Sequence, residues 1–166
     1  MVRVDIETIV MAAGPVPSLI VLRERCSKSD SPAPLRSLSI QTGSFEAAAI
    51  SRGIDSGRAE RPITHDLLLD TVGALGAKLE RIEIVRAEPP VFYATVVVLA
   101  DGNEHKIDAR PSDAIALAVR SNAPMFVEDD IMNRLGTVFT HAEEVDDEQE
   151  FEKFDEFVHT LSPDDF

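Results

Sequence analysis

The sequence predicts an α+β fold, in which a mixed, largely antiparallel sheet carries three or four helices and an acidic amphipathic helix follows at the C-terminus. Several short stretches alternate apolar and polar residues, which is typical of half-buried strands. Two longer segments begin with Arg-Pro and continue with apolar residues at helical spacing. Near the end of the chain, phenylalanines recur at helical spacing among acidic residues.

The expected strands share alternating or continuous apolar patterns bounded by turn residues. They cover residues 2–10, 19–23, 35–41, 78–87, 91–100, 104–108 and 125–127. The stretch VFYATVVVLA at 91–100 is the most apolar and the best candidate for a central strand. The sequence Asp101-Gly102-Asn103 should form the hairpin turn that follows it.

Four helices are expected, at residues 45–51, 61–76, 111–122 and 128–135. Ser44 and Thr64 are the expected N-caps of the first two, because their hydroxyls can accept a backbone N–H. In the second helix an apolar stripe of Leu68, Val72 and Leu75 should face the core, and Gly76 should end the helix. The third helix is nearly all apolar and should be buried.

Charge divides the chain into a body at residues 1–135 and an acidic extension at 136–166. The net charge is −14, and residues 143–166 carry 11 acids against the single base Lys153, which leaves −4 for the first 142 residues. Neither part has the basic surface of a tight, non-specific nucleic-acid binder. A nuclease that recruits a divalent cation is still compatible with this charge.

The acidic extension also has an apolar side. Phe151, Phe154, Phe157 and Leu161 form one helical stripe, which must be buried against the body, another subunit or a partner. We expect it to pack on the folded protein.

No apolar run approaches the roughly 20 residues that cross a bilayer, and the single cysteine, Cys26, rules out an internal disulfide. We therefore expect a cytoplasmic protein without membrane contact.

Two motifs resemble each other: Arg-Pro-Ile-Thr-His-Asp at residues 61–66 and Arg-Pro-Ser-Asp at 110–113. Proline, a hydroxyl and an acid at a helix start are explained by capping and by the helix dipole. Capping does not require the arginines. They predict either an anion pocket beside a helix N-terminus or ion pairs in which Arg61 binds Asp113 and Arg110 binds Asp66. Because the motif is repeated, we expect Arg61 and Arg110 to lie near each other, together with the starts of the two helices that follow them.

The strings ERPITHDLL and IDARPSDAIALAVR, with GSFEAAAI upstream and FEKFDEFVHTLSPDDF at the end, resemble the bifunctional nuclease domain family. The resemblance covers nearly the whole chain and implies an α+β domain that cleaves RNA and DNA. It marks nine polar positions: Glu46, Arg61, Thr64, His65, Asp66, Asp108, Arg110, Ser112 and Asp113.

Our first hypothesis is a phosphodiesterase acting on RNA or DNA. Catalysis would rest on His65 as general acid or base, with Asp66 and Asp113. Mg²⁺ or Mn²⁺ would be held by carboxylates of Glu46, Asp66, Asp108 and Asp113. The substrate phosphate would be bound by Arg61 and Arg110, together with Thr64 and Ser112. The alternative is a non-enzymatic homo-oligomeric module in which the Arg-Pro motifs are structural.

Overall fold

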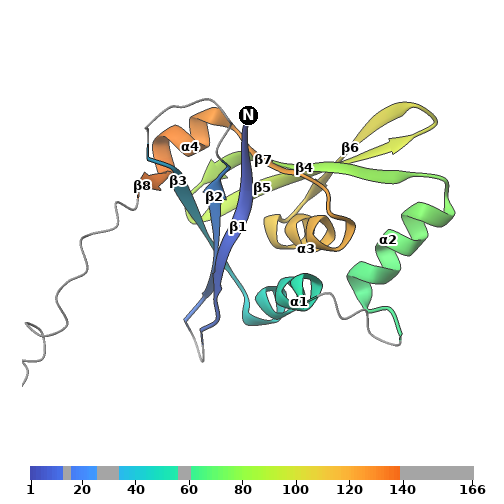
Figure 1. Ribbon diagram of the computed structural model, residues 1–166, viewed down its shortest axis with the longest axis horizontal. Helices are drawn as coiled ribbons and strands as arrows, with labels where there is room; N and C mark the ends of the chain where they lie inside the picture. The colour runs from blue at the N-terminus through green and yellow to red at the C-terminus, as the bar shows by residue number, and fades with distance from the viewer. Residues whose placement is uncertain (13–15, 26–33, 56–60, 139–166) are drawn as a thin grey trace, which may run out of the picture.

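The computed structural model describes residues 1–12, 16–25, 34–55 and 61–138. In this part of the chain an eight-stranded sheet and four helices confirm the α+β prediction (Figure 1). The predicted helix at Phe151–Leu161 lies outside the described residues. None of the described helices is long and apolar enough to cross a membrane.

The elements follow the predicted ranges closely except β8, which was not predicted and lies at the start of the segment assigned to the acidic extension. The strands are β1 (Val2–Val10), β2 (Ser18–Glu24), β3 (Arg36–Thr42), β4 (Lys78–Glu88), β5 (Val91–Ala100), β6 (Asn103–Ala109), β7 (Met125–Val127) and β8 (Thr137–Val138). The helices are α1 (Ser44–Ile54), α2 (Thr64–Ala74), α3 (Pro111–Ser121) and α4 (Asp129–Leu135).

The strands are ordered β6-β5-β4-β7-β1-β2-β3-β8. Neighbours are antiparallel except β4 and β7, which are parallel. The turn between β5 and β6 has positive φ at Asp101 (51°) and Gly102 (76°), as a two-residue hairpin requires. Strand β5 is interior but does not lie at the middle of the sheet. Short β7, which follows α3, takes a middle place between β4 and β1.

Helices α1 and α3 lie beside each other on one side of the sheet (Figure 1). Helix α3 is buried from Ala114 to Ala118, as its apolar sequence predicts. The two helices approach closely at Gly53, where an added Cβ would lie 2.6 Å from Val119 Cγ2 and 2.7 Å from Arg120 Nη1. This close approach joins the C-terminal end of α1 to the C-terminal end of α3.

Helix α2 differs from its prediction in the side that it buries. Leu68 and Leu75 are 48% and 79% exposed, whereas Val72 and the unpredicted Leu69 pack against the core. The predicted stripe is therefore wrong in two of its three members. No residue of α2 is fully buried, because α2 rests on its neighbours along one narrow side. Gly76, with φ of 75°, ends the helix as predicted.

The predicted N-caps are wrong by one residue. Thr64 and Ser44 are the first residues of their helices, and the N-caps are Ile63 and Gly43. Neither N-cap has a side chain that can accept a hydrogen bond. In α2 the side chain of Asp66 replaces the missing cap by accepting a hydrogen bond from the Ile63 backbone N–H at 3.1 Å.

Candidate functional site

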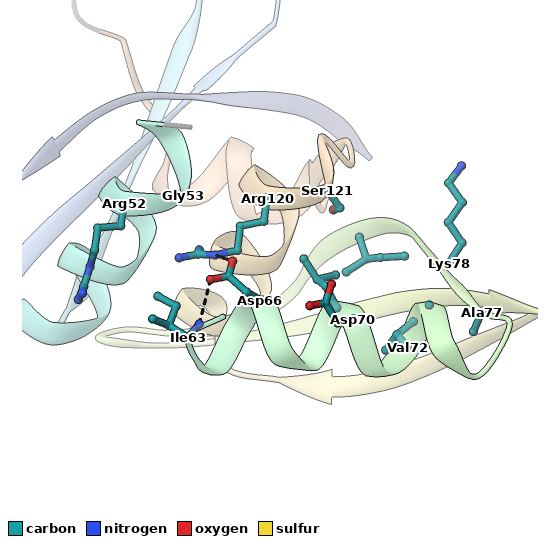
Figure 2. A pocket seen from close by; sticks show the side chains of 13 residues that line it. Arg52, Gly53, Ile63, Asp66, Asp70, Val72, Ala77, Lys78, Arg120 and Ser121 are labelled. Atoms are coloured by element: carbon teal, nitrogen blue, oxygen red, sulfur yellow. Dashed lines mark hydrogen bonds and ion pairs between the residues drawn. The ribbon is translucent and has the colours of Figure 1, made fainter. Parts of the chain in front are cut away.

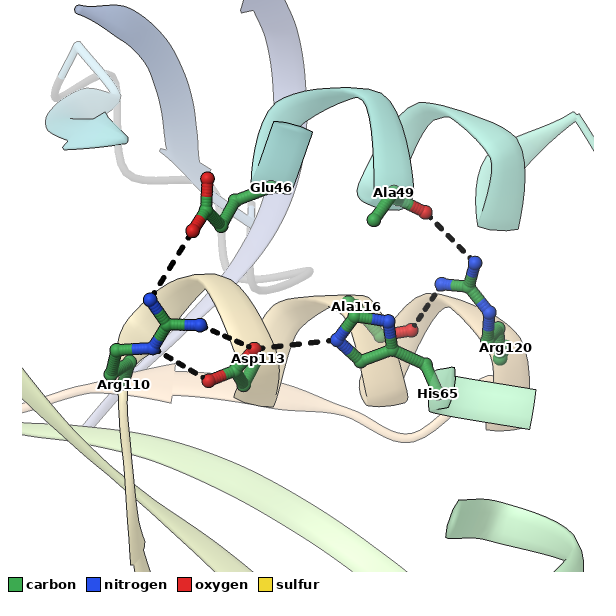
Figure 3. A network of polar contacts seen from close by, with 7 residues as sticks. All are labelled: Glu46, Ala49, His65, Arg110, Asp113, Ala116 and Arg120. Carbon is green, nitrogen blue, oxygen red and sulfur yellow. Dashed lines mark hydrogen bonds and ion pairs between the residues drawn. The ribbon is translucent and has the colours of Figure 1, made fainter. Parts of the chain in front are cut away.

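The two Arg-Pro motifs come together in the fold. They lead into α2 and α3, and His65 in the first turn of α2 reaches Asp113 in the first turn of α3. His65 Nε2 lies 3.3 Å from Asp113 Oδ1, and Figure 3 shows the imidazole directed at this carboxylate. The expectation that the helix starts adjoin is confirmed.

Arg110 joins these residues to a third helix. Its Nε donates to Asp113 Oδ2 at 2.8 Å, and its Nη2 donates to Asp113 Oδ1 at 3.2 Å. Its Nη1 donates to Glu46 Oε1 of α1, also at 3.2 Å (Figure 3). We call these four side chains, Glu46, His65, Arg110 and Asp113, the polar network. It connects residues from three helices that are up to 67 positions apart in the chain.

Asp113 is the centre of this network, and its environment acts on its charge in two directions. Burial alone would raise the pKa of this carboxyl, but hydrogen bonds from Arg110 and His65 favour the ionised form and leave the pKa lowered. The same pairing with Asp113 raises the pKa of the Arg110 guanidinium. Asp113 is therefore an ionised acceptor that holds both Arg110 and the His65 ring in place.

Arg110 retains capacity to bind a further anion. The guanidinium has five N–H donors, and the contacts among the described residues use three of them. Its side chain is 66% exposed. However, the positive charge of Arg110 stands beside two carboxylates, those of Glu46 and Asp113. An anionic phosphate would therefore bind poorly here unless a further cation accompanied it.

The network opens on a pocket of about 280 Å³. Glu46, Arg110 and Ser112 form its polar side, and the turn at Pro90-Val91 forms part of its apolar side. Gly43 also lines it, and the Glu46 carboxylate folds back over this glycine, so that a Cβ at position 43 would lie 2.2 Å from Glu46 Oε2. The absence of a side chain at Gly43 thus allows Glu46 to take the position in which it meets Arg110.

Asp66 belongs to a separate, more buried ion pair. Arg120 Nε donates to Asp66 Oδ1 at 2.9 Å, and the two side chains are only 7% and 15% exposed. The remaining Arg120 nitrogens donate to the carbonyls of Ala116 and Ala49, each at 2.8 Å (Figure 3). Arg120 thus joins α1, α2 and α3, and the expected pairing of Arg110 with Asp66 is wrong.

Sequence reasoning overlooked Arg120. The available signal was its position as the only charged residue in the apolar run IALAVRS, since a buried arginine needs a carboxylate and carbonyl partners.

A larger cavity of about 460 Å³ lies beside the Asp66–Arg120 pair, lined by residues from α1, α2, α3 and β4 (Figure 2). The Asp66–Arg120 pair forms part of its wall.

The other expected site residues lie outside the polar network. Arg61 and Thr64 are exposed at the start of α2, and Arg61 makes no hydrogen bond or ion pair with another described residue. The expected pairing of Arg61 with Asp113 is therefore wrong as well, because Asp113 binds Arg110. Asp108 is exposed on β6, where it lies opposite Thr95. Ser112 is buried and faces the pocket of the network.

The expected metal ligands are not gathered into one preformed site. In the ranges that the structure describes, no group of three or more His, Cys, Asp or Glu residues is placed to hold an ion. Of the four expected acids, Glu46 and Asp113 share the polar network, whereas Asp66 is bound by Arg120 and Asp108 lies on β6. Glu46 and Asp113 are therefore the two expected ligands that the structure brings to a common partner, Arg110.

Comparison with known proteins places this geometry in a family context. Residues 28–140 match the family model described as the bifunctional nuclease domain. Two uncharacterized proteins of Mycobacterium tuberculosis, one from strain CDC 1551 / Oshkosh and one from strain ATCC 25618 / H37Rv, are each 39% identical to this chain over 138 residues. The alignment covers 79% of this chain and 81% of each relative.

Proposed function

The chain belongs to the bifunctional nuclease domain family, and on that premise we propose that it is a phosphodiesterase that hydrolyses RNA or DNA at the polar network. The observation that supports this proposal best is Arg110, an exposed guanidinium with unused N–H donors between two carboxylates and beside a His–Asp pair. These are the groups that phosphodiester hydrolysis needs: an anion holder, an acid or base, and oxygen ligands.

His65 is the general base in this proposal. Asp113 is ionised and accepts a hydrogen bond from Nε2–H, which leaves the lone pair on Nδ1 to accept a proton. In hydrolysis a water oxygen bonds to phosphorus while a proton of that water passes to Nδ1. The bond from phosphorus to the leaving oxygen then breaks, and the leaving oxygen takes up a proton from solvent water. Asp113 orients the ring and stabilises the imidazolium that forms.

Arg110 binds the phosphate in this proposal, and the charge count explains why a cation would be needed. The unused N–H groups of Arg110 can donate to a phosphate oxygen, but the two neighbouring carboxylates repel the same phosphate. Magnesium is commonly held by one or two carboxylates together with substrate phosphate and water. We propose that Glu46 and Asp113 would hold Mg²⁺ or Mn²⁺, which would offset the negative charge of the substrate phosphate.

The test is cleavage of end-labelled RNA and single-stranded DNA by the purified chain, with Mg²⁺, Mn²⁺ or EDTA. We expect cleavage with metal and none with EDTA. Asp113→Asn should reduce the rate at least 100-fold, because a positioned acid or base contributes roughly 10²–10⁴. The matched control is Asp130→Asn, which breaks an Arg–Asp pair at the start of α4 (Arg134 Nε to Asp130 Oδ2, 2.9 Å). Equal loss of activity in both variants would contradict the proposed site.

A second candidate function is an oligomeric module without catalysis. Two observations favour it: the Asp66–Arg120 pair explains one motif acid as a structural residue, and α2 exposes Leu67, Leu68 and Leu75. Exposed apolar residues on one helix are typical of an interface. If Leu75→Glu shifts the mass measured by sedimentation to that of the monomer while no preparation cleaves nucleic acid, this second candidate is correct.

A further inference from the structure

Arg120 is a nearly buried arginine in the last turn of α3, at the opposite end of that helix from Asp113. Its side chain is only 7% exposed. It donates one hydrogen bond to a carboxylate, that of Asp66 at 2.9 Å, and two to backbone carbonyls, those of Ala116 and Ala49 at 2.8 Å each. A buried guanidinium is costly unless such partners satisfy it. None of these three bonds goes to the polar network, so any effect of Arg120 on the site passes through the helices that it holds.

Both backbone carbonyls that Arg120 binds lie close to a carboxylate of the polar network. Ala49 follows Glu46 by three residues in α1, and Ala116 follows Asp113 by three residues in α3. Residues three apart are neighbours on the surface of a helix. Arg120 therefore joins α1 to α3 within about one turn of both carboxylates (Figure 3).

Asp66 extends the same control to α2. Its Oδ1 accepts the bond from Arg120, while its Oδ2 accepts a hydrogen bond from the Ile63 backbone N–H at 3.1 Å. These two bonds tie Arg120 to the first turn of α2, the turn in which His65 lies. Because no residue of α2 is fully buried, few other contacts fix where this turn stands.

The contacts inside the polar network are too weak to set these positions themselves. His65 Nε2 lies 3.3 Å from Asp113 Oδ1, whereas N–H···O bonds in proteins measure about 2.7–3.2 Å. Arg110 reaches Glu46 at 3.2 Å from a side chain that is 66% exposed, and an exposed ion pair contributes little to stability because water screens it. The bonds of Arg120 are shorter and nearly buried. They therefore determine where the three helices stand, and the network takes the geometry that results.

We propose that Arg120 is a positioning residue, which holds the His65 ring within hydrogen-bond distance of Asp113. The effect on cleavage rests on the proposed function, in which this pair is the general base. A displacement of about 1 Å is enough to cost on the order of 100-fold in rate, so loss of the three bonds should lower kcat by about that factor. KM should change no more than a few-fold, because Arg110 keeps its bond to Asp113 within the first turn of α3.

The test is the substitution Arg120→Lys. Lysine keeps the positive charge beside Asp66, but its single ammonium cannot reach the three acceptors that the planar guanidinium spans. The first measurement is the proton NMR signal of His65 Nε2–H, identified by its absence from His65→Gln. This signal is seen only while the bond to Asp113 slows exchange with water, so we expect it in the wild type and expect its loss in Arg120→Lys. The second measurement is kcat and KM for RNA with Mg²⁺, of which kcat should fall.

The matched control is Arg36→Lys. Arg36 of β3 also joins three elements, because it donates to Glu24 of β2 at 2.9 Å and to Asn133 of α4 at 2.6 Å. Its hydrogen bonds to the described residues do not include the polar network. Arg36→Lys should therefore keep both the His65 signal and the wild-type kcat.

A second variant covers the case in which Arg120→Lys does not fold, as judged by circular dichroism. The double variant Asp66→Ala with Arg120→Met then takes its place, because removing both charges leaves neither one buried without a partner. The same two measurements apply to it, with the same expected results.

The outcomes separate this inference from the proposed function. Loss of the His65 signal in folded Arg120→Lys but not in Arg36→Lys supports the inference. If the wild type lacks the signal, if Arg120→Lys keeps it, or if both lysine variants lose it, the inference is overturned. The signal does not depend on cleavage, so a wild type that cleaves no nucleic acid, while Arg120→Lys still loses the signal, contradicts the proposed function and supports the positioning by Arg120.

Discussion

Asp66 and Asp113 both lie in the first turn of a helix that follows an Arg-Pro pair, but they bind different arginines. Asp113 binds Arg110 of its own motif, at a half-buried place beside His65. Asp66 binds Arg120, which enters from the far end of α3. We therefore assign Asp113 to chemistry and Asp66 to the positioning of α2, although the sequence presents them as equivalent.

The buried pair gives the first prediction. Asp66→Ala should lower the free energy of unfolding by about 3–5 kcal/mol, because removal of one partner leaves a nearly buried charge without its ion pair. The double variant Asp66→Ala with Arg120→Met should lose less than the sum of the two single variants. Urea unfolding of all four proteins measures this coupling, and additive losses would show that the pair contributes nothing beyond its separate hydrogen bonds.

Asp66→Asn serves to test the assignment itself. At a temperature where this variant remains folded by circular dichroism, its cleavage rate should stay within a few-fold of the wild type, in contrast to Asp113→Asn. If folded Asp66→Asn and folded Asp113→Asn lost activity equally, Asp66 would be a catalytic residue and our assignment of it to a structural role would be wrong.

Asp113 also predicts a dependence of stability on pH. Its pKa is lowered in the folded protein, so its contribution to stability is present above the unfolded value of about 3.9 and is lost as the pH falls through the folded value. The difference in unfolding free energy between wild type and Asp113→Asn should therefore be largest near pH 7 and shrink below about pH 4. Urea titrations at several pH values test this, and a constant difference would mean that the ion pair does not act through the charge of Asp113.

At the scale of the element, the start of α1 shows how a backbone position sets the site. Gly43→Ala would bring a Cβ to 2.2 Å from Glu46 Oε2, and the flexible carboxylate must move away. We expect loss of the Arg110–Glu46 contact and reduced cleavage, with a stability loss of only about 1 kcal/mol, since Ala is a poorer N-cap than Gly. Thermal unfolding together with the cleavage assay checks both parts. The control is Phe45→Leu, a substitution in the same turn of α1. It should leave Glu46 in place, so that the Arg110–Glu46 contact is retained.

The elements also show what sequence patterns can and cannot predict. The strands and helices followed from periodicity because each short stretch has its own polar and apolar alternation, as at β1 and β3. The buried side of α2 did not follow, because its leucines are spread around the helix, and only the neighbouring α3 and β4 determine that Leu69 and Val72 face inward. Local patterns carry no information about which neighbour an element meets.

The site was predictable to a similar degree. The motifs marked His65, Arg110 and Asp113, and their repetition predicted that the two helix starts adjoin. The pairs that it suggested were others, because Asp113 binds Arg110 and His65. The partner of Asp66 could not be predicted, since Arg120 lies 54 residues away and its reach across α3 depends on how the helices cross. The role of Gly43 was also hidden, because it depends on the fold-back of one side chain.

At the scale of the whole molecule, charge is divided unevenly between the part that holds the site and the C-terminal extension. The polar network and its pocket belong to the first 142 residues, which carry −4, whereas residues 143–166 carry −10. The nucleic-acid substrate that we propose would approach a chain whose last 24 residues carry −10, and this charge repels a polyanion. The extension should therefore reduce the association rate for polyanions at low ionic strength.

Deletion of residues 143–166 tests this at the level of the whole chain. We expect the shortened protein to bind single-stranded oligonucleotides more tightly than the full chain at low salt, because the repulsive charge is removed. The difference should diminish as salt is raised, since the screening length falls from about 30 Å at 0.01 M to about 3 Å at 1 M. A second variant, with the acids of residues 143–156 changed to their amides, keeps Phe151 and Phe154 and should behave like the deletion if charge is the cause. If the amide variant binds like the full chain while the deletion binds more tightly, then the apolar stripe of the extension, and not its charge, controls access to the site.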